Sequence, residues 1–495
     1  MVWTIPDRQV LEEKTTEISF PTQLLIDGQF RDALSGQTFE TLNPATGKKL
    51  ADVAAAGKED IDLTVSAARK AFENGPWARM SGRERGRILY KVAQLIRERQ
   101  GELAILESMD NGKPISEAQF APLTAAEVFE YYAGWADKYH GEVVPLKTNN
   151  LNYILHEPMG VIGAITPWNF PMTQSTFKTV PAVAMGNSVV LKPAEQTPLT
   201  ALVIGRLCLE AGMPEGVWNV VPGIGEVAGA SLAAQPDVDA ISFTGSTEVG
   251  KLVMAAASVN LKKISLECGG KSPNIVFADA DLDQAVQGAL TGIFYNQGQV
   301  CNAGSRLFLQ ESIHDRFLEK LVSYARSLIV GNPLDPKTKM GAIVSQEQLD
   351  KDLRYIELGK ADRANLLTGG RRIAELEGFF LEPTIFSEVD NRMPIAQEEI
   401  FGPVLSVIKF KDLDEAVELA NQTIYGLAAG VWTRDVKTAH TMARRLRDGT
   451  VWINIFGPFD IASPWTGYKQ SGVGTEWGRN MLEFVTQVKS VWIAL

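Results

Sequence analysis

From residue 160 onward the sequence repeats a strand, a turn and a helix, and this alternation restricts the chain to a small set of folds. The first series of predicted strands covers residues 161–165, 188–191, 218–221, 240–243 and 263–266. Each strand is a short, nearly continuous apolar run, followed by a turn and then by a helical segment. Such units are typical of a parallel, doubly wound sheet with helices on both faces. Ligands of these sheets bind at the carboxyl ends of the strands.

A second series of the same units begins near residue 274. Its predicted strands are 274–277, 307–309, 404–410, 431–433 and 450–454, with helices at 282–294 and 313–329. The sequence therefore predicts an α/β protein with two doubly wound, Rossmann-like parallel-sheet domains, for which 495 residues suffice. Residues 1–40 are predicted to form an irregular arm that ends in a hairpin at Asp27-Gly28. Amphipathic helices are predicted after it at 59–74, 81–99 and 123–139.

Two further segments belong to neither series. Residues 144–156 interrupt the helical pattern and are predicted to be a pair of extended strands that protrudes from the globular body. The apolar residues 488–495 are typical of an edge strand, which promotes aggregation when it is left unpaired. We therefore expect this strand to pair with another subunit, alongside residues 144–156, in a homodimer or homotetramer.

Composition and charge exclude several classes of protein. The formal net charge is −11 and there is no basic run, which argues against nucleic acid as a partner. No apolar run reaches the ~18 residues of a membrane span, and residues 1–9 lack the apolar core of a signal peptide. The 3 cysteines lie far apart and the 4 histidines are scattered, so the sequence predicts neither a metal site nor a disulfide framework. This cysteine usage suits a reducing cytoplasm.

Residues 294–306 place Cys301 among polar residues and glycines, directly ahead of a predicted strand. A buried structural cysteine usually has apolar neighbours, whereas this segment is suited to bend and to expose backbone N–H groups. A thiol held there can attack a carbonyl carbon, and the N–H beside it can bind the oxyanion that forms. Taken alone, Cys301 is better explained as part of an ordinary helix–strand connection.

Two motifs at strand ends are suited to a nucleotide. Lys192 and Glu195 follow a strand, where a carboxylate can accept from both ribose hydroxyls of an adenosine and repel a 2′-phosphate. Gly245 and Gly250 lie between a strand and a helix, where backbone can approach a phosphate at the helix N-terminus. Taken alone, the first motif is better explained as a solvated loop pair, and a plain strand–helix turn explains the second equally well.

Three other motifs offer an amide or a carboxylate. Asn169 lies in Pro167-Trp-Asn-Phe-Pro171, where two prolines fix an extended loop and its amide can bind an oxyanion, or form an ordinary Asn turn. Glu267, at a strand end before two glycines, can take a proton from a thiol or a water, or form a structural ion pair. Glu399 lies beside Phe401 in a segment that by itself predicts only a loop.

Together these segments resemble the aldehyde dehydrogenase superfamily, in the family's order, from about residue 25 to the C-terminus. The matching motifs lie at 167–171, 192–198, 243–250, 266–273, 298–301, 399–403 and 467–472. The resemblance is to the non-acylating, NAD(P)-dependent members, in the class 1/2 and retinal dehydrogenase-like branch. It implies a small β oligomerisation arm beside the two sheet domains. The implied ranges are 1–135 and 158–268 for NAD binding, 269–480 for catalysis, and 136–157 and 481–495 for the arm.

The resemblance also implies a role for each matching residue. Cys301 would form a thiohemiacetal with the aldehyde, Asn169 and the Cys301 backbone N–H would hold its oxyanion, and Glu267 would activate the water that releases the acid. Lys178 and Glu476 would relay the proton outward. The cofactor is implied to be NAD, with weaker use of NADP, and its residues would be Ile165, Trp168, Lys192, Glu195, Gly225, Gly245, Ser246, Glu399 and Phe401. The aldehyde tunnel would be lined by Phe170, Gln174, Phe177, Val300, Asn302, Phe459 and Trp465.

The implied tunnel has four aromatic residues among seven and none that is charged. This composition favours medium-to-long aliphatic, aromatic or isoprenoid aldehydes, with betaine aldehyde or a semialdehyde as the alternative substrate class. The departures from the family pattern at 465–467 and 475–477 affect the substrate side rather than the chemistry. Cys268, a third departure beside Glu267, is better explained as inert packing than as a site of oxidation. Glu267 argues against a CoA-acylating relative. Cys301, Glu267 and Asn169 together argue against a silent structural member.

Overall fold

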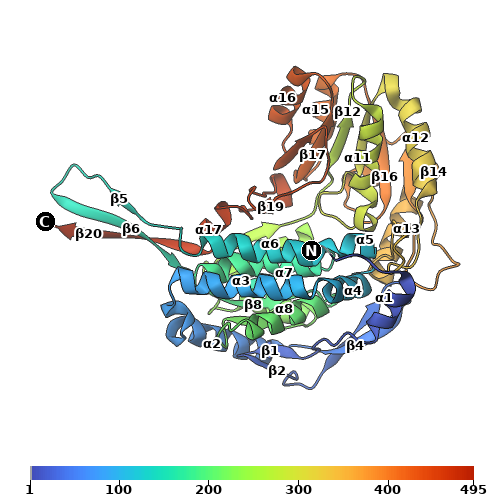
Figure 1. Ribbon diagram of the computed structural model, residues 1–495. Helices are drawn as coiled ribbons and strands as arrows, with labels where there is room; N and C mark the ends of the chain where they lie inside the picture. Colours follow the sequence, from blue (N-terminus) through green and yellow to red (C-terminus); the bar gives the residue numbers. More distant parts are fainter. Residues whose placement is uncertain (1–2) are drawn as a thin grey trace.

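The computed structural model describes residues 3–495 and confirms the predicted α/β class. Figure 1 shows two lobes, each built of helices around a sheet, and a thin arm that extends from the lower lobe. Across the described residues, no helix is both long enough and apolar enough to cross a membrane.

An eight-stranded sheet forms the centre of the lower lobe, in the order β19-β11-β10-β7-β8-β9-β1-β2. Its parallel strands are β7 (Val161–Ile165), β8 (Ser188–Lys192), β9 (Trp218–Val220), β10 (Ala240–Thr244) and β11 (Lys263–Glu267). Antiparallel strands extend both edges: β19 (Gly472–Val473), β1 (Leu24–Ile26) and β2 (Gln29–Arg31). Because β8 and β10 lie on opposite sides of β7, the strand order reverses there and opens a ligand crevice at the carboxyl ends.

Helices cover both faces of this sheet. They are α2 (Lys58–Asn74), α3 (Gly82–Glu98), α4 (Gln100–Asn111), α5 (Ile115–Ala118), α6 (Phe120–Trp135), α7 (Pro171–Ala184), α8 (Leu199–Glu210), α9 (Ala230–Ala234) and α10 (Thr247–Ala257). The core between α6 and the sheet contains Phe129 and Trp218, whose stacked rings lie 5.9 Å apart. A separate hairpin, β3 (Thr38–Asn43) with β4 (Lys48–Ala54), lies beside them.

The upper lobe contains a seven-stranded sheet in the order β14-β15-β16-β13-β12-β17-β18. Six strands are parallel: β12 (Pro273–Val276), β13 (Arg306–Gln310), β15 (Thr384–Ser387), β16 (Val404–Phe410), β17 (Ala428–Trp432) and β18 (Thr450–Ile453). The edge strand β14 (Asn365–Thr368) is antiparallel. The helices of this lobe are α11 (Leu282–Phe294), α12 (His314–Ser327), α13 (Gln346–Ala361), α14 (Pro394–Gln397), α15 (Leu413–Asn421) and α16 (Val436–Arg445).

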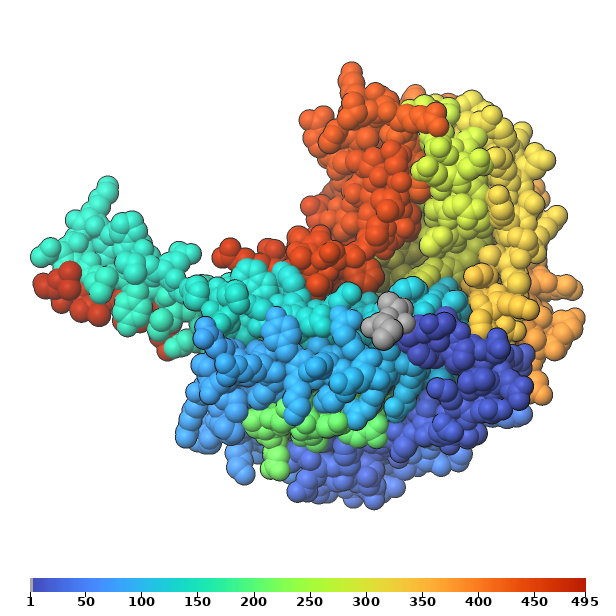
Figure 2. All heavy atoms as spheres, in the orientation of Figure 1, coloured from blue at the N-terminus to red at the C-terminus, as the bar shows by residue number. Residues whose placement is uncertain are grey.

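The arm is a three-stranded antiparallel sheet in the order β20-β6-β5, which follows the short helix α17 (Asn480–Phe484). Its strands are β5 (Glu142–Val144), β6 (Asn150–Pro158) and β20 (Thr486–Ala494). β20 pairs with β6 along its whole length, so it does lie beside the predicted protrusion, within the same chain. Figure 2 shows that the arm stands away from the body of the molecule.

Several predicted boundaries are wrong for local reasons. The N-terminal region is not wholly irregular, because α1 (Arg8–Thr15) forms there and buries Leu11 against Ala104 and Ile105 of α4. α7 begins with Pro171, whose fixed φ suits the first helical position. α10 begins inside the glycine motif, because the Ser246 hydroxyl accepts a hydrogen bond from the Val249 backbone N–H and caps the helix.

Candidate active site

A cavity of about 150 Å³ lies where the carboxyl edge of the first sheet meets the segment that contains Cys301. It is lined by Pro167, Trp168, Asn169, Thr244, Gly245, Ser246, Gly269, Cys301, Gln348, Lys351, Glu399 and Phe401. The loops after β7 and β10 therefore meet the nucleophile candidate and the Glu399 segment in one place. This is the crevice expected where the strand order reverses.

The Cys301 segment is held in an unusual backbone conformation. Asn296 and Gln297 have φ values of 46° and 56°, in the left-handed region that non-glycine residues rarely adopt. The Gln297 side chain fixes this turn, because it donates to the Ala342 carbonyl at 2.9 Å and accepts from the Gly341 N–H at 3.1 Å. Cys301 itself is half-buried.

The thiol of Cys301 is not acidic in this setting. Burial, reinforced by the carboxylates of Glu267 and Glu399, raises the pKa of Cys301 to about 12. The neutral thiol is therefore the resting form at neutral pH, and a nucleophilic role requires a base that removes its proton.

Asn169 reaches the same segment from the other side. Its side-chain Nδ2 donates a hydrogen bond to the Gln299 carbonyl at 2.9 Å, and the residue is 3% exposed. An amide nitrogen carries two hydrogens, so a second N–H remains for an oxyanion. The loop thus presents a donor beside Cys301, as the sequence predicts.

Glu267 ends β11 in a buried cluster with Lys178 and Glu476. Within the described chain, neither carboxylate oxygen of Glu267 has a hydrogen-bond partner. Burial, and secondly the charge of Glu476, raise the pKa of Glu267 well above its usual value, while Lys178 opposes the shift. Lys178 Nζ lies 2.6 Å from Glu476 Oε1, which also accepts from the Ser242 hydroxyl at 3.0 Å. The structure therefore brings together the three groups that the resemblance assigns to proton handling.

Two glycines beside the cavity pack closely against neighbouring side chains. A Cβ on Gly245 would lie 2.5 Å from the Phe243 ring, and one on Gly269 would lie 2.3 Å from Glu399 Oε2. Glu399 accepts from the Gly270 N–H at 2.9 Å, and burial raises its pKa to about 7. A side chain at Gly245 would therefore displace the Phe243 ring, and one at Gly269 would displace the carboxylate of Glu399.

The residues that are predicted to hold the adenosine ribose also lie close together. Lys192, 3% exposed at the end of β8, forms an ion pair with Glu195 at 2.9 Å. A Cβ on Gly225 would lie 3.9 Å from the charged atoms of both side chains. Ile165 ends the neighbouring strand β7, which pairs directly with β8. The residues therefore fit a dinucleotide that lies across the ends of β7, β8 and β10.

An aromatic cluster includes three of the predicted tunnel residues. The ring of Trp477 lies 4.8 Å from Phe177, 5.3 Å from Phe459 and 5.1 Å from Trp465. Phe170 stacks separately on Tyr295 at 6.1 Å. Gln174 lies one turn before Phe177 on α7, and Val300 and Asn302 flank Cys301. In the sequence, only the departure from the family pattern at 475–477 pointed to a role for Trp477.

Comparison with known proteins decides the family. Residues 30–491 match the aldehyde dehydrogenase family. The chain belongs to the aldehyde dehydrogenase family. It is 49% identical to the mitochondrial aldehyde dehydrogenase of Homo sapiens over 477 residues, 96% of this chain and 92% of that protein.

Solved structures that are similar to this chain are also aldehyde dehydrogenases. The indole-3-acetaldehyde dehydrogenase AldA of P. syringae, in complex with NAD+ and IAA, superposes with a TM-score of 0.97 at 44% identity, covering 99% of this chain and 100% of that one. An aldehyde dehydrogenase from Bacillus cereus in complex with NAD+ has a TM-score of 0.95 at 47% identity, with 97% and 98% coverage. The protein is thus an NAD-dependent aldehyde dehydrogenase.

Two lining residues of this aldehyde dehydrogenase lie outside every motif that the sequence predicts. Gln348 and Lys351 extend from α13 into the cavity. The Gln348 amide donates to the carbonyls of Ile400 at 3.0 Å and Phe401 at 3.3 Å, which holds Phe401 at a φ of 69°. Trp168 meets the Phe401 ring edge-on at 5.1 Å. No glycine or proline motif marks α13, so the sequence offered no signal.

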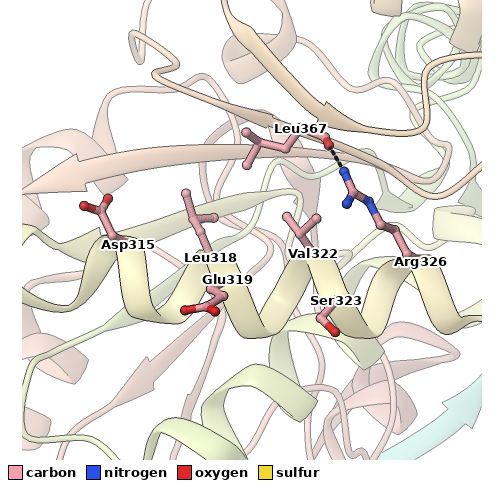
Figure 3. A pocket seen from close by; sticks show the side chains of 7 residues that line it. All are labelled: Asp315, Leu318, Glu319, Val322, Ser323, Arg326 and Leu367. Carbon is pink, nitrogen blue, oxygen red and sulfur yellow. Dashed lines mark hydrogen bonds between the residues drawn. The ribbon is translucent and has the colours of Figure 1, made fainter.

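A larger hollow of about 610 Å³ lies on the surface of α12 beside β14 (Figure 3). Its lining residues are Asp315, Leu318, Glu319, Val322, Ser323, Arg326 and Leu367. The Arg326 side chain is held in place, because it donates a hydrogen bond to the Leu367 carbonyl at 2.8 Å. None of the predicted site residues of the aldehyde dehydrogenase lines this groove, so size does not identify the active site.

Proposed function

We propose that this aldehyde dehydrogenase oxidises apolar, medium-to-long aliphatic, aromatic or isoprenoid aldehydes to carboxylic acids through covalent intermediates on Cys301. The observation that carries the proposal is the shared cavity of Cys301 and Asn169, with the Glu267 carboxylate near enough to raise the thiol pKa. A nucleophile, an oxyanion donor and a base are the parts that acyl chemistry requires.

The first half of the reaction uses all three groups. Ionised Glu267 takes the proton of the Cys301 thiol, and the thiolate attacks the aldehyde carbon to form a thiohemiacetal. Its oxyanion accepts hydrogen bonds from the free Asn169 N–H and the Cys301 backbone N–H. NAD, when bound, supplies the hydride acceptor that turns the thiohemiacetal into a thioester.

The second half uses Glu267 again. After the thiol proton has left Glu267, its carboxylate takes a proton from water, the resulting hydroxide attacks the thioester carbon, and the thiolate leaves as the acid is released. The neighbouring Lys178–Glu476 pair, joined at 2.6 Å, offers a path by which the proton leaves the buried site. Burial raises the pKa of Glu267 well above its usual value, which makes its ionised carboxylate a stronger base.

NAD is proposed to be preferred over NADP. Glu195, whose carboxylate is fixed by Lys192, can accept from ribose hydroxyls and would oppose a 2′-phosphate. Glu226, exposed in the neighbouring turn, adds a second negative charge. Binding of NADP would therefore place its 2′-phosphate close to two negative charges.

The aromatic cluster favours apolar substrates. Burying an aldehyde chain there gains about 25 cal/mol per Å² of apolar surface. Asp460 follows the predicted tunnel residue Phe459 and is the nearest carboxylate in the sequence that could hold a cationic substrate. Its side chain is exposed and caps its own turn, because it accepts a hydrogen bond from the Ala462 N–H at 2.8 Å. The similar P. syringae enzyme is named for indole-3-acetaldehyde, an aromatic aldehyde.

The test is kcat/KM for acetaldehyde, hexanal, decanal, benzaldehyde, betaine aldehyde and succinic semialdehyde with NAD. We expect kcat/KM to rise with apolar surface and to be lowest for the charged aldehydes. A maximum at either charged substrate would overturn the proposal. Cys301→Ala is the control, which should bind NAD and produce no NADH.

We also propose that the arm mediates self-association in the cytoplasm. Val488 and Trp492 of β20 and Leu495 directly after it are 65%, 60% and 80% exposed, a large apolar area for a projecting sheet. All three cysteines are free thiols, which suits a reducing compartment. The proposed ranges remain 1–135 and 158–268 for NAD binding, 269–480 for catalysis, and 136–157 with 481–495 for the arm. A monomer in sedimentation at micromolar concentration would contradict the assembly.

A further inference from the structure

A buried ion pair at the end of α4 contacts the loop that carries Asn169. Lys113 Nζ lies 2.9 Å from Glu107 Oε1, and the two side chains are 2% and 0% exposed. Apolar residues of similar volume usually stabilise a core as well as such a pair does. The pair therefore calls for a role other than stability.

Lys113 fixes the peptide that follows Asn169. Its Nζ donates to the Asn169 carbonyl at 3.0 Å and lies 4.3 Å from the centre of the Phe170 ring. The same carbonyl also accepts from Asn296 Nδ2 at 2.9 Å. A carbonyl held by two donors, one of them charged, cannot rotate without losing both bonds, so the backbone orientation at Asn169 is fixed.

Glu107 fixes the next turn of the same segment. Its second oxygen, Oε2, accepts from the Met172 backbone N–H at 3.4 Å, in the first turn of α7. The first N–H groups of a helix lack partners within the helix, and a carboxylate there also interacts favourably with the helix dipole. Phe170, which precedes the helix, has no side-chain acceptor, so Glu107 supplies the cap from another element.

The same hydrogen-bond network reaches the segment that contains Cys301. Asn169 Nδ2 donates to the Gln299 carbonyl, two residues before Cys301, at 2.9 Å. Asn296, from the left-handed turn of that segment, donates back to the Asn169 carbonyl. The oxyanion loop and the Cys301 segment are thus held together by hydrogen bonds whose charged end is the Glu107–Lys113 pair.

We infer that Glu107 and Lys113 are positioning residues, which hold the Asn169 amide where the oxyanion forms. The inference rests on the proposed function, in which Asn169 binds that oxyanion. Misplacement of a catalytic group by an ångström lowers rates on the order of 10²-fold. Loss of the pair should therefore slow the first turnover by about that factor and change NAD affinity much less, because Glu195, Gly245 and Glu399 lie on other loops and, of the predicted cofactor residues, only Trp168 shares the loop of Asn169.

The variants are Lys113→Met and the double variant Glu107→Gln/Lys113→Met, which leaves no unpaired buried charge. If Lys113→Met does not fold, the test is made with the double variant. Lys262→Met is the matched control, because Lys262 is also buried and donates to the carbonyls of Ala233 at 2.8 Å and Gln235 at 2.7 Å, away from the cavity. NAD binding is measured first for each protein, and the rate of the NADH burst is then followed by rapid mixing with saturating aldehyde.

The deciding measurement repeats the Lys113 change in an Asn169→Ala background. If Lys113 acts through Asn169, the burst rate should change by less than about twofold there, since the group that it positions is gone. Equal losses in both backgrounds would show a merely structural role and overturn the inference. A double variant that keeps a burst rate within about twofold of the unmodified enzyme would also overturn it. Failure of the unmodified enzyme to form NADH with any aldehyde of the panel would instead refute the proposed function.

Discussion

Replacing Lys178 by methionine would leave the Glu476 carboxylate buried without its cation. The two charged atoms are 2.6 Å apart, and the side chains are 0% and 3% exposed. Among residues 3–495, its remaining side-chain hydrogen-bond donors would be the hydroxyls of Ser242 at 3.0 Å and Ser265 at 3.5 Å. Removing one partner of a buried pair costs about 3–5 kcal/mol. We expect the free energy of unfolding of Lys178→Met to fall by this amount.

The double variant Lys178→Met/Glu476→Gln separates charge from packing. It leaves no uncompensated charge, and its lost neutral hydrogen bonds are each worth about 1 kcal/mol. It should therefore lose less stability than Lys178→Met alone. The assay is urea unfolding followed by tryptophan fluorescence for both single variants, the double variant and the unmodified protein. Additive losses would refute the reasoning, because they would show that the two groups do not interact.

The same pair should also move the pH dependence of turnover in opposite directions. Lys178 lowers the pKa of Glu267 and Glu476 raises it. Glu267 acts as a base only when it is ionised, so Glu476→Gln should shift the acidic limb of the rate profile to lower pH. Lys178→Met should shift it to higher pH. Shifts in the same direction would contradict the assigned charges.

Three more predictions concern the carboxylates around the cavity. Glu267→Gln should slow the steady state more than the NADH burst, because a thiol ionises without the base far more readily than water does; equal slowing of both phases would contradict this difference. Glu195→Gln should raise kcat/KM with NADP, and comparable efficiency of the unmodified enzyme with both cofactors would contradict the assignment. NAD binding should tighten as the pH rises through about 7, where Glu399 ionises, because a carboxylate accepts from ribose hydroxyls more strongly than a carboxylic acid does. Fluorescence titrations should find this dependence absent in Glu399→Gln, and a flat profile in the unmodified enzyme would refute it.

The parallel-sheet architecture and the strand-end motifs could be predicted because they depend on local pattern. Strands such as β7 and β8 are buried at every residue, and an unbroken apolar run marks them in the sequence. Asn169, Glu195 and Gly245 follow such strands directly, so topology alone places them at one edge. Their specific roles came from family resemblance, since each motif alone had an ordinary explanation.

Features that depend on tertiary contacts could not be predicted from residue patterns. Lys178 and Glu476 are 298 residues apart and no spacing rule joins them, so only the family resemblance placed them together. Gln348 enters the cavity from a helix without a motif, and Glu107 and Lys113 look like surface charges until burial shows otherwise. Helix α1 forms because Leu11 finds a buried site on α4, which no local propensity reveals.

The most direct test is to locate the acyl group itself. Glu267→Gln enzyme is mixed with NAD and hexanal, quenched in acid during the burst, digested and examined by mass spectrometry. The mechanism predicts the acyl mass on the peptide that contains Cys301. An acyl mass on the peptide that contains Cys268, or a burst of NADH without any adduct, would contradict Cys301 as the nucleophile.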